Sequence, residues 1–145
     1  MKTIALRFAD NIAPKEGTIA EHERVIARYG FVWYGKFGTR VSEKAKDYIM
    51  STDDKRVLLI HSGTSKRYWL YVDDISYEVP ELSGVPEYYR DRAEVVKTWF
   101  RVTRIEKADK NVMAKCTVSS SGSPLSAVSR HSMSPYFIID YNEGA

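Results

Sequence analysis

The segment Arg56-Val57-Leu58-Leu59-Ile60-His61 constrains the fold more than any other part of the chain. Its apolar residues follow one another without polar residues between them, so a strand made of them is covered on both faces. After the turn Ser62-Gly63-Thr64-Ser65, apolar and polar residues alternate over residues 67–77, which is typical of a hairpin partner. We therefore expect a core built around a central strand.

The rest of the chain predicts further strands with helices between them. Thr18 and Glu21 form an expected capping box at the start of a helix that stops at Gly30, and Ser42 is expected to cap a second helix. Residues 80–91 are expected to form a long ordered loop and residues 119–134 a serine-rich connector. Strands are predicted over residues 3–8, 31–34, 95–105, 111–118 and 136–141, and helices between Thr18 and Gly30 and over residues 43–50.

The length of 145 residues suits a single domain over residues 1–145. No apolar run approaches the ~20 residues that cross a bilayer, and the charges at Lys2 and Arg7 come too early for a secretory signal. The lone Cys116 excludes an internal disulfide framework and a cysteine-based zinc site, and we expect it to be a buried structural thiol. These features predict a cytoplasmic protein with no membrane partner.

Catalysis has little support in the sequence. The three histidines, His22, His61 and His131, lie in different predicted elements, and no Gly-x-Ser-x-Gly motif accompanies them. The acidic pairs at residues 53–54 and 73–74 are expected to be solvated, and the segment from Gly35 to Gly38 lacks the dinucleotide-binding fingerprint. The sequence therefore predicts no enzyme activity, no cofactor and no metal.

Charge and aromatic content favour a binding role without naming the ligand. The net charge of +3 is modest, and basic residues are interleaved with acidic ones. Ten tyrosines and three tryptophans favour interfaces or stacking pockets. Trp33 ends a predicted short strand just before Gly35 and Lys36, so its ring either faces solvent or anchors the first helix to the sheet.

Five blocks of the chain together resemble one superfamily. The segment Gly30–Lys36 and the helix after Ser42 resemble the Gly-Val-Trp segment of YTH domains and the Trp-x-Gly-Val-Arg segment of EVE domains, both PUA-like. Further blocks that are similar in family order lie at residues 56–63, 69–75, 96–102 and 130–135. The resemblance implies an α+β fold of PUA-like architecture: a strongly curved six- or seven-stranded sheet or open barrel with two main helices packed on it.

The resemblance also implies a base-reading site. YTH domains hold adenine methylated on its exocyclic amine in an aromatic cage, and EVE-like relatives are linked to modified DNA bases, including as N-terminal modules of McrB-type restriction systems. By this resemblance Trp33 is the first cage wall, the carbonyl of Tyr34 accepts a hydrogen bond from the methylated amine, and Tyr88 or Tyr89 is the second wall. The base-binding candidates are Asp10, Trp33, Tyr34, His61, Ser62, Trp69, Tyr88 and Tyr89. The candidates for backbone contacts are Arg7, Lys36, Arg40, Lys44, Lys66, Arg67, Arg90 and Arg130.

We therefore expect a module that recognises a modified, methylated base flipped into an aromatic cage. Modified DNA is favoured over RNA as its partner, because the Lys-Ser-x-x-Asn pattern of YTH proteins is absent. The expected setting is a modification-dependent restriction or related defence system, with chemistry left to a fused or associated nuclease or ATPase. The alternative is a protein-interaction module whose tyrosine-rich loops bind a partner and whose Trp33 is purely structural.

Overall fold

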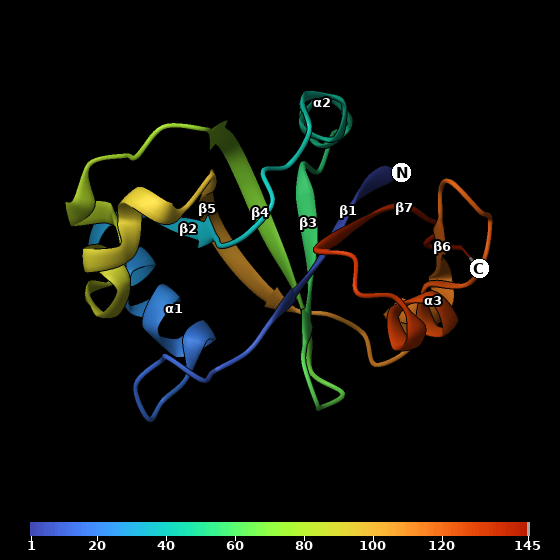
Figure 1. Ribbon diagram of the computed structural model, residues 1–145, viewed down its shortest axis with the longest axis horizontal. Helices are drawn as coiled ribbons and strands as arrows, with labels where there is room; N and C mark the ends of the chain where they lie inside the picture. The colour runs from blue at the N-terminus through green and yellow to red at the C-terminus, as the bar shows by residue number, and fades with distance from the viewer. Residues whose placement is uncertain (145) are drawn as a thin grey trace.

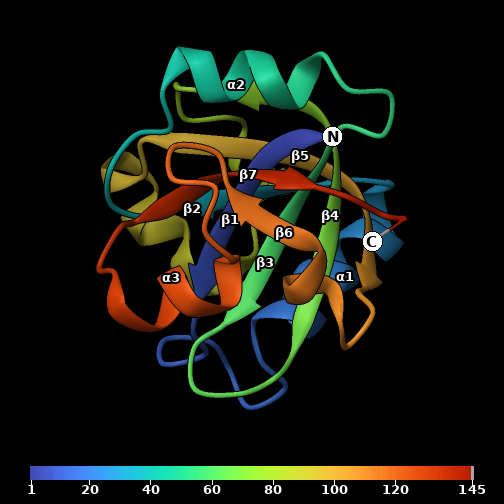
Figure 2. The same cartoon turned by 90° about the vertical axis from the view of Figure 1, so that its right-hand side faces the viewer.

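The computed structural model describes residues 1–144 as one seven-stranded sheet with helices on both sides (Figure 1). The strands run in the order β2-β5-β4-β3-β1-β7-β6, so the strongly curved sheet stays open between β2 and β6 (Figure 2). The strands are β1 (Lys2–Phe8), β2 (Val32–Lys36), β3 (Arg56–His61), β4 (Arg67–Ser76), β5 (Thr98–Lys107), β6 (Cys116–Val118) and β7 (Tyr136–Tyr141). The α-helices are α1 (Thr18–Tyr29), α2 (Glu43–Met50) and α3 (Leu125–His131), and the 3₁₀ helices are η1 (Leu82–Gly84), η2 (Glu87–Val95) and η3 (Val112–Lys115).

Strand β3 lies at the centre of the sheet and is buried on both faces, as its sequence predicts. It pairs in parallel with β1 and antiparallel with β4. Val57 and Leu59 belong to the larger core, which α1 and α2 cover, whereas Leu58 and Ile60 belong to a second core under η3 and α3. The predicted α+β fold with a curved, open sheet is confirmed, and a third α-helix joins the two that were expected.

Several local predictions are wrong. Thr18 does not cap α1, because it is the first helical residue and the N-cap is Gly17, whose φ of 92° suits glycine. The carboxylate of Asp10 takes the capping role, since its Oδ1 accepts a hydrogen bond from the Thr18 N–H at 2.8 Å. Residues 112–115 form η3 before β6 begins, and strand β5 starts at Thr98 because η2 continues to Val95. The expected loop over residues 80–91 contains η1 and the first part of η2.

Another wrong prediction concerns the serine-rich connector, which contains helix α3. The guanidinium group of Arg7 donates to the carbonyl oxygens of Ser129 and Ser132 at the end of this helix and to that of Ser134 just beyond it. These bonds satisfy carbonyl groups that a helix leaves unpaired at its C-terminus. A contact from β1 therefore stabilises a seven-residue helix that its own composition does not signal.

Among residues 1–144, no helix combines the length and the apolar character that crossing a membrane requires.

Candidate functional site

A cavity of about 210 Å³ lies where α1, the end of β1, β2 and η2 meet. Six of the residues that line it carry aromatic rings: Phe8, His22, Tyr34, Phe37, Tyr88 and Tyr89. Tyr34 and Tyr89 are buried, whereas Phe37 is exposed and Tyr88 is half-buried. We call this space the aromatic cavity.

A chain of hydrogen bonds fixes one wall of the aromatic cavity. His22 Nδ1 donates to the carbonyl oxygen of Thr18 at 2.8 Å, and His22 Nε2 lies 2.8 Å from the hydroxyl oxygen of Tyr89. Complete burial lowers the pKa of His22 to about 4, so at neutral pH its Nε2 accepts the proton of Tyr89. The Gly35 N–H donates to the same hydroxyl oxygen at 3.1 Å. Tyr89 thereby joins α1, β2 and η2.

Gly35 is required for this arrangement. A Cβ atom at this position would lie 2.9 Å from Cζ3 of Trp99 and 3.1 Å from Cε2 of Tyr89, closer than side chains normally approach. The missing side chain lets the Tyr89 ring pack against β2, which is an edge strand of the sheet.

The hydroxyl group of Tyr34 is a polar group of the aromatic cavity that has no protein partner among residues 1–144. It forms no hydrogen bond with any residue of the described chain, although Tyr34 is only 7% exposed and lines the cavity. Burial raises the pKa of Tyr34, with further contributions from Tyr88 and Asp10, so the hydroxyl stays protonated and can donate or accept. The hydroxyl oxygen is not among the fully buried atoms that lack a partner, so it keeps contact with solvent and a ligand in the cavity can reach it.

The charged residues that line the aromatic cavity are Arg7 and Lys36, and no described carboxylate lines it. Lys36 is nearly buried, and its Nζ donates to the carbonyl oxygens of Thr39 at 2.6 Å and Phe37 at 3.3 Å. Burial lowers the pKa of Lys36. Both charged residues of the lining are therefore basic, while the carboxylate of Asp10 lies close enough to influence Tyr34.

Next to the aromatic cavity, Asp10 connects helix α1 to the turn between β3 and β4. Its Oδ1 caps α1, and its Oδ2 lies 2.7 Å from Nε2 of His61, whose Nδ1 lies 2.8 Å from the hydroxyl oxygen of Thr64. Desolvation raises the pKa of Asp10, but its hydrogen bonds with Thr18 and His61 outweigh this and lower it. Asp10 and His61 thus act as a structural link beside the cavity.

The structure brings only part of the predicted base-binding set together. Tyr34, Tyr88 and Tyr89 line the aromatic cavity, whereas His61 and Ser62 line a neighbouring pocket. Trp33 lies on the opposite face of β2, where it packs beside Gly84 and the cluster that contains Trp99. It therefore does not line the cavity.

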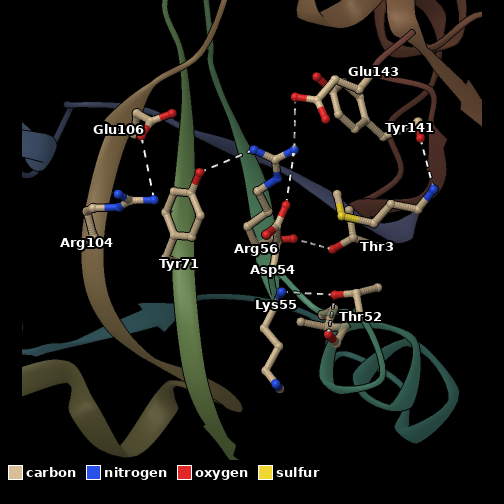
Figure 3. Close-up of polar contacts among 12 residues, drawn as sticks. Thr3, Thr52, Asp54, Lys55, Arg56, Tyr71, Arg104, Glu106, Tyr141 and Glu143 are labelled. Atoms are coloured by element: carbon tan, nitrogen blue, oxygen red, sulfur yellow. Dashed lines mark hydrogen bonds and ion pairs between the residues drawn. The ribbon is translucent and has the colours of Figure 1, made fainter.

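Trp69 is also distant from the aromatic cavity, because it belongs to the second core on the other face of the sheet. The Arg56 guanidinium lies over its ring at 4.3 Å. Figure 3 shows that Arg56 also reaches Tyr71, Asp54 and Glu143, with nitrogen–oxygen distances of 3.3, 3.7 and 4.0 Å.

The predicted backbone contacts divide into separate groups. Arg7, Arg67 and Arg130 line the pocket that also contains His61, and Lys66 lies exposed in the same turn. Arg40 precedes α2, and its guanidinium group lies over the ring of Tyr77. Lys44 belongs to α2, and its ammonium group lies over the ring of Tyr48. Arg90 donates from its Nε to the carbonyl oxygen of Val85.

Sequence reasoning missed Phe8, His22 and Phe37 as cavity residues. Thr18 and His22 are four residues apart on α1 and so share one helix face. This spacing could have indicated that His22 lies beside Thr18 at the cavity. Phe37 gives no comparable signal, because a turn residue between two glycines points wherever the turn directs it.

The fold and the aromatic cavity define a small α+β domain with a ligand pocket beside an edge strand. A family model described as Pua-like matches residues 4–140, and the chain therefore belongs to the Pua-like family. This membership supports nucleic-acid binding in general as its role. Comparisons with the curated proteins and with the solved structures found no significant match.

Proposed function

We propose that this protein recognises a modified, methylated base of a nucleic acid by receiving that base in the aromatic cavity. The observation that carries the proposal is the unpartnered hydroxyl of Tyr34 inside a cavity lined by aromatic rings. A planar base offers ring nitrogens and exocyclic amines to such a hydroxyl, and its faces stack on the rings.

The size of the aromatic cavity favours a single base. At about 210 Å³ it is smaller than the ~300–1,000 Å³ typical of sites for drug-sized ligands. A whole nucleotide would leave its sugar and phosphate outside. The base is therefore taken from a single strand or flipped out of a duplex, which costs a few kcal/mol.

The aromatic rings that line the cavity also explain how a methyl group on the base can be recognised. Burying one methyl group contributes only ~0.8 kcal/mol, while stacking on an aromatic ring contributes ~1–3 kcal/mol per base. Tyr88 and Phe37 are the accessible rings for stacking, and the buried rings of Tyr34 and Tyr89 close the space around a methyl group. A rigid cavity turns a small apolar gain into discrimination because an unmethylated base leaves part of it unfilled.

The wider role rests on the resemblance to EVE and YTH domains. It favours modified DNA over RNA and a specificity module of a modification-dependent restriction or related defence system. In this role the chain binds and a fused or associated nuclease or ATPase carries out the chemistry. The two charged residues that line the cavity, Arg7 and Lys36, are both basic, which supports an anionic polymer as the ligand.

The experiment is a fluorescence-anisotropy titration with matched oligonucleotides. They carry unmodified, adenine-methylated or cytosine-methylated bases, as single and double strands, at two salt concentrations. We expect selective binding of one modified form, lost in Tyr88→Ala and kept in the control Tyr29→Ala, since Tyr29 is exposed at the end of α1 and does not line the cavity. Equal, steeply salt-dependent binding of all forms would contradict the proposal, because it would reflect phosphate contacts alone.

A further inference from the structure

A second pocket, of about 430 Å³, lies where the end of β1, the turn between β3 and β4, and the end of α3 meet. Three arginines line it, Arg7, Arg67 and Arg130, together with His61 and the hydroxyl residues of the turn. No described carboxylate lines this arginine pocket, and none of its arginines forms a salt bridge with a described residue. The guanidinium charges of the pocket are thus not paired with a described carboxylate, although Asp10 Oδ2 lies 2.7 Å from Nε2 of His61.

Two of the three arginines are held in place. Arg7 is fixed by the carbonyl oxygens of Ser129, Ser132 and Ser134. Arg67 donates from Nη1 to the carbonyl oxygens of Thr64 and Lys66, while its buried Nε has no hydrogen-bond partner. A held guanidinium binds an anion with a smaller loss of side-chain entropy than a free lysine does. Two guanidinium groups are therefore positioned at this pocket before any anion binds.

The arginine pocket adjoins the aromatic cavity. Arg7 lines both spaces, and the ring of Phe8, which lines the aromatic cavity, contacts the ring of His61 at 4.9 Å between centroids. The bonds from Asp10 to His61 and from His61 to Thr64 tie the turn of the arginine pocket to the start of α1. A group bound in one space therefore lies beside a group bound in the other.

We propose that the arginine pocket binds a backbone phosphate that adjoins the base held in the aromatic cavity. This inference rests on the proposed function for the position of the base, but not for the anion site itself. A phosphodiester supplies the charge and the acceptor oxygens that the guanidinium groups and turn hydroxyls can pair with. Contacts to the base then determine which nucleic acid is selected, and the contact to the phosphate fixes the position of the strand.

The pocket beside Arg56 does not offer the same chemistry. Arg56 is buried, but the residues that line that pocket include Asp54, Asp140 and Glu143. These carboxylates repel a phosphate, and two of them already lie within 4.0 Å of the Arg56 guanidinium. The anion site is therefore assigned to the arginine pocket.

The test compares three probes: a trinucleotide with a central N6-methyladenine or 5-methylcytosine, the matching free nucleosides, and an abasic trinucleotide. Each is titrated against the wild type, Arg67→Gln and Arg130→Gln. The control is Arg104→Gln, because Arg104 is exposed on β5 and lines neither space. We expect each pocket variant to bind the trinucleotide about tenfold more weakly. The salt slope should fall by about one phosphate contact, and nucleoside affinity should stay unchanged.

The outcomes separate the two proposals. Binding of the abasic probe that depends on Arg67 or Arg130, without nucleoside binding by the wild type, supports the anion site and contradicts the base site. An equal loss in Arg104→Gln, or an unchanged salt slope in both pocket variants, overturns the arginine pocket. Arg130 is exposed, so its variant is expected to fold even if Arg67→Gln does not, and Arg67→Lys tests whether charge alone restores binding.

Discussion

The hydroxyl oxygen of Tyr89 lies 2.8 Å from Nε2 of His22, and this contact joins η2 to α1 across a sequence separation of 67 residues. Because the Gly35 N–H donates to the same oxygen, a single side chain holds three elements in register. The cavity therefore has a wall whose geometry is set before any ligand arrives, and this arrangement gives the first prediction.

Replacing Tyr89 with phenylalanine should destabilise the protein. It leaves Nε2 of His22 and the N–H of Gly35 buried without partners, which costs ~1–3 kcal/mol for each unsatisfied group. Urea unfolding would measure the loss. Tyr29→Phe is the control, since Tyr29 is exposed, and equal stability of both variants would show that the bonds of Tyr89 contribute nothing.

Replacing Tyr34 with phenylalanine should weaken binding without loss of stability. The hydroxyl of Tyr34 has no partner among residues 1–144, so its removal leaves no protein group unpaired. Affinity for the preferred modified oligonucleotide should fall about threefold to tenfold, the value of one hydrogen bond. Thermal unfolding should show an unchanged Tm, and unchanged affinity would exclude a contact between Tyr34 and the base.

Replacing Trp33 with alanine should lower the stability of the protein and leave its affinity for the modified base nearly unchanged. Its half-buried ring packs against Gly84 and the cluster around Trp99, outside the aromatic cavity. The free energy of unfolding should fall by about 2 kcal/mol, while affinity for the modified base changes less than about twofold. Loss of binding in a variant with an unchanged Tm would instead identify Trp33 as a cage wall.

Stability should fall as the pH drops from 6.5 towards 4 because of His22. Its pKa in the folded protein is about 4, below its ordinary 6.5, so the unfolded chain takes up a proton in this range and the folded one does not. The free energy of unfolding should decrease by up to about 3 kcal/mol across the window. Asp10 contributes to the pH dependence of stability only below this window, because its pKa in the folded protein lies below its ordinary 3.8.

Chemical unfolding at a series of pH values measures this dependence. His22→Gln should be less stable than the wild type at pH 7 but flatter between pH 6.5 and 4. The matched control is His131→Gln, because His131 is exposed. An equally steep fall in His22→Gln would assign the pH dependence to another group.

Cys116 should resist alkylation in the native protein. Burial raises the pKa of its thiol to about 11, and its Sγ donates to the carbonyl oxygen of Val112 at 3.3 Å. Since the thiolate is the reactive form, iodoacetamide at pH 7.5 should label the folded protein much more slowly than the urea-unfolded one. Mass spectrometry measures the rates, and comparable rates would show that Cys116 is accessible.

The sequence by itself determined the central strand and the main helices. The unbroken apolar run over residues 57–60 requires cover on both faces wherever the strand lies, so its burial follows from hydrophobicity alone. Ser42 likewise caps α2 through a bond to the Ala45 N–H, which is local chemistry that sequence spacing encodes.

Only the tertiary structure decided which residues share a site. Helix α3 is held by Arg7 from the other end of the chain, and α1 is capped by Asp10 rather than by its own first residue. Trp33 and Tyr34 are neighbours in sequence, yet strand geometry turns one away from the cavity and the other into it. The face that each takes depends on which side η2 and α1 cover, and such contacts between distant segments are not encoded in local residue patterns.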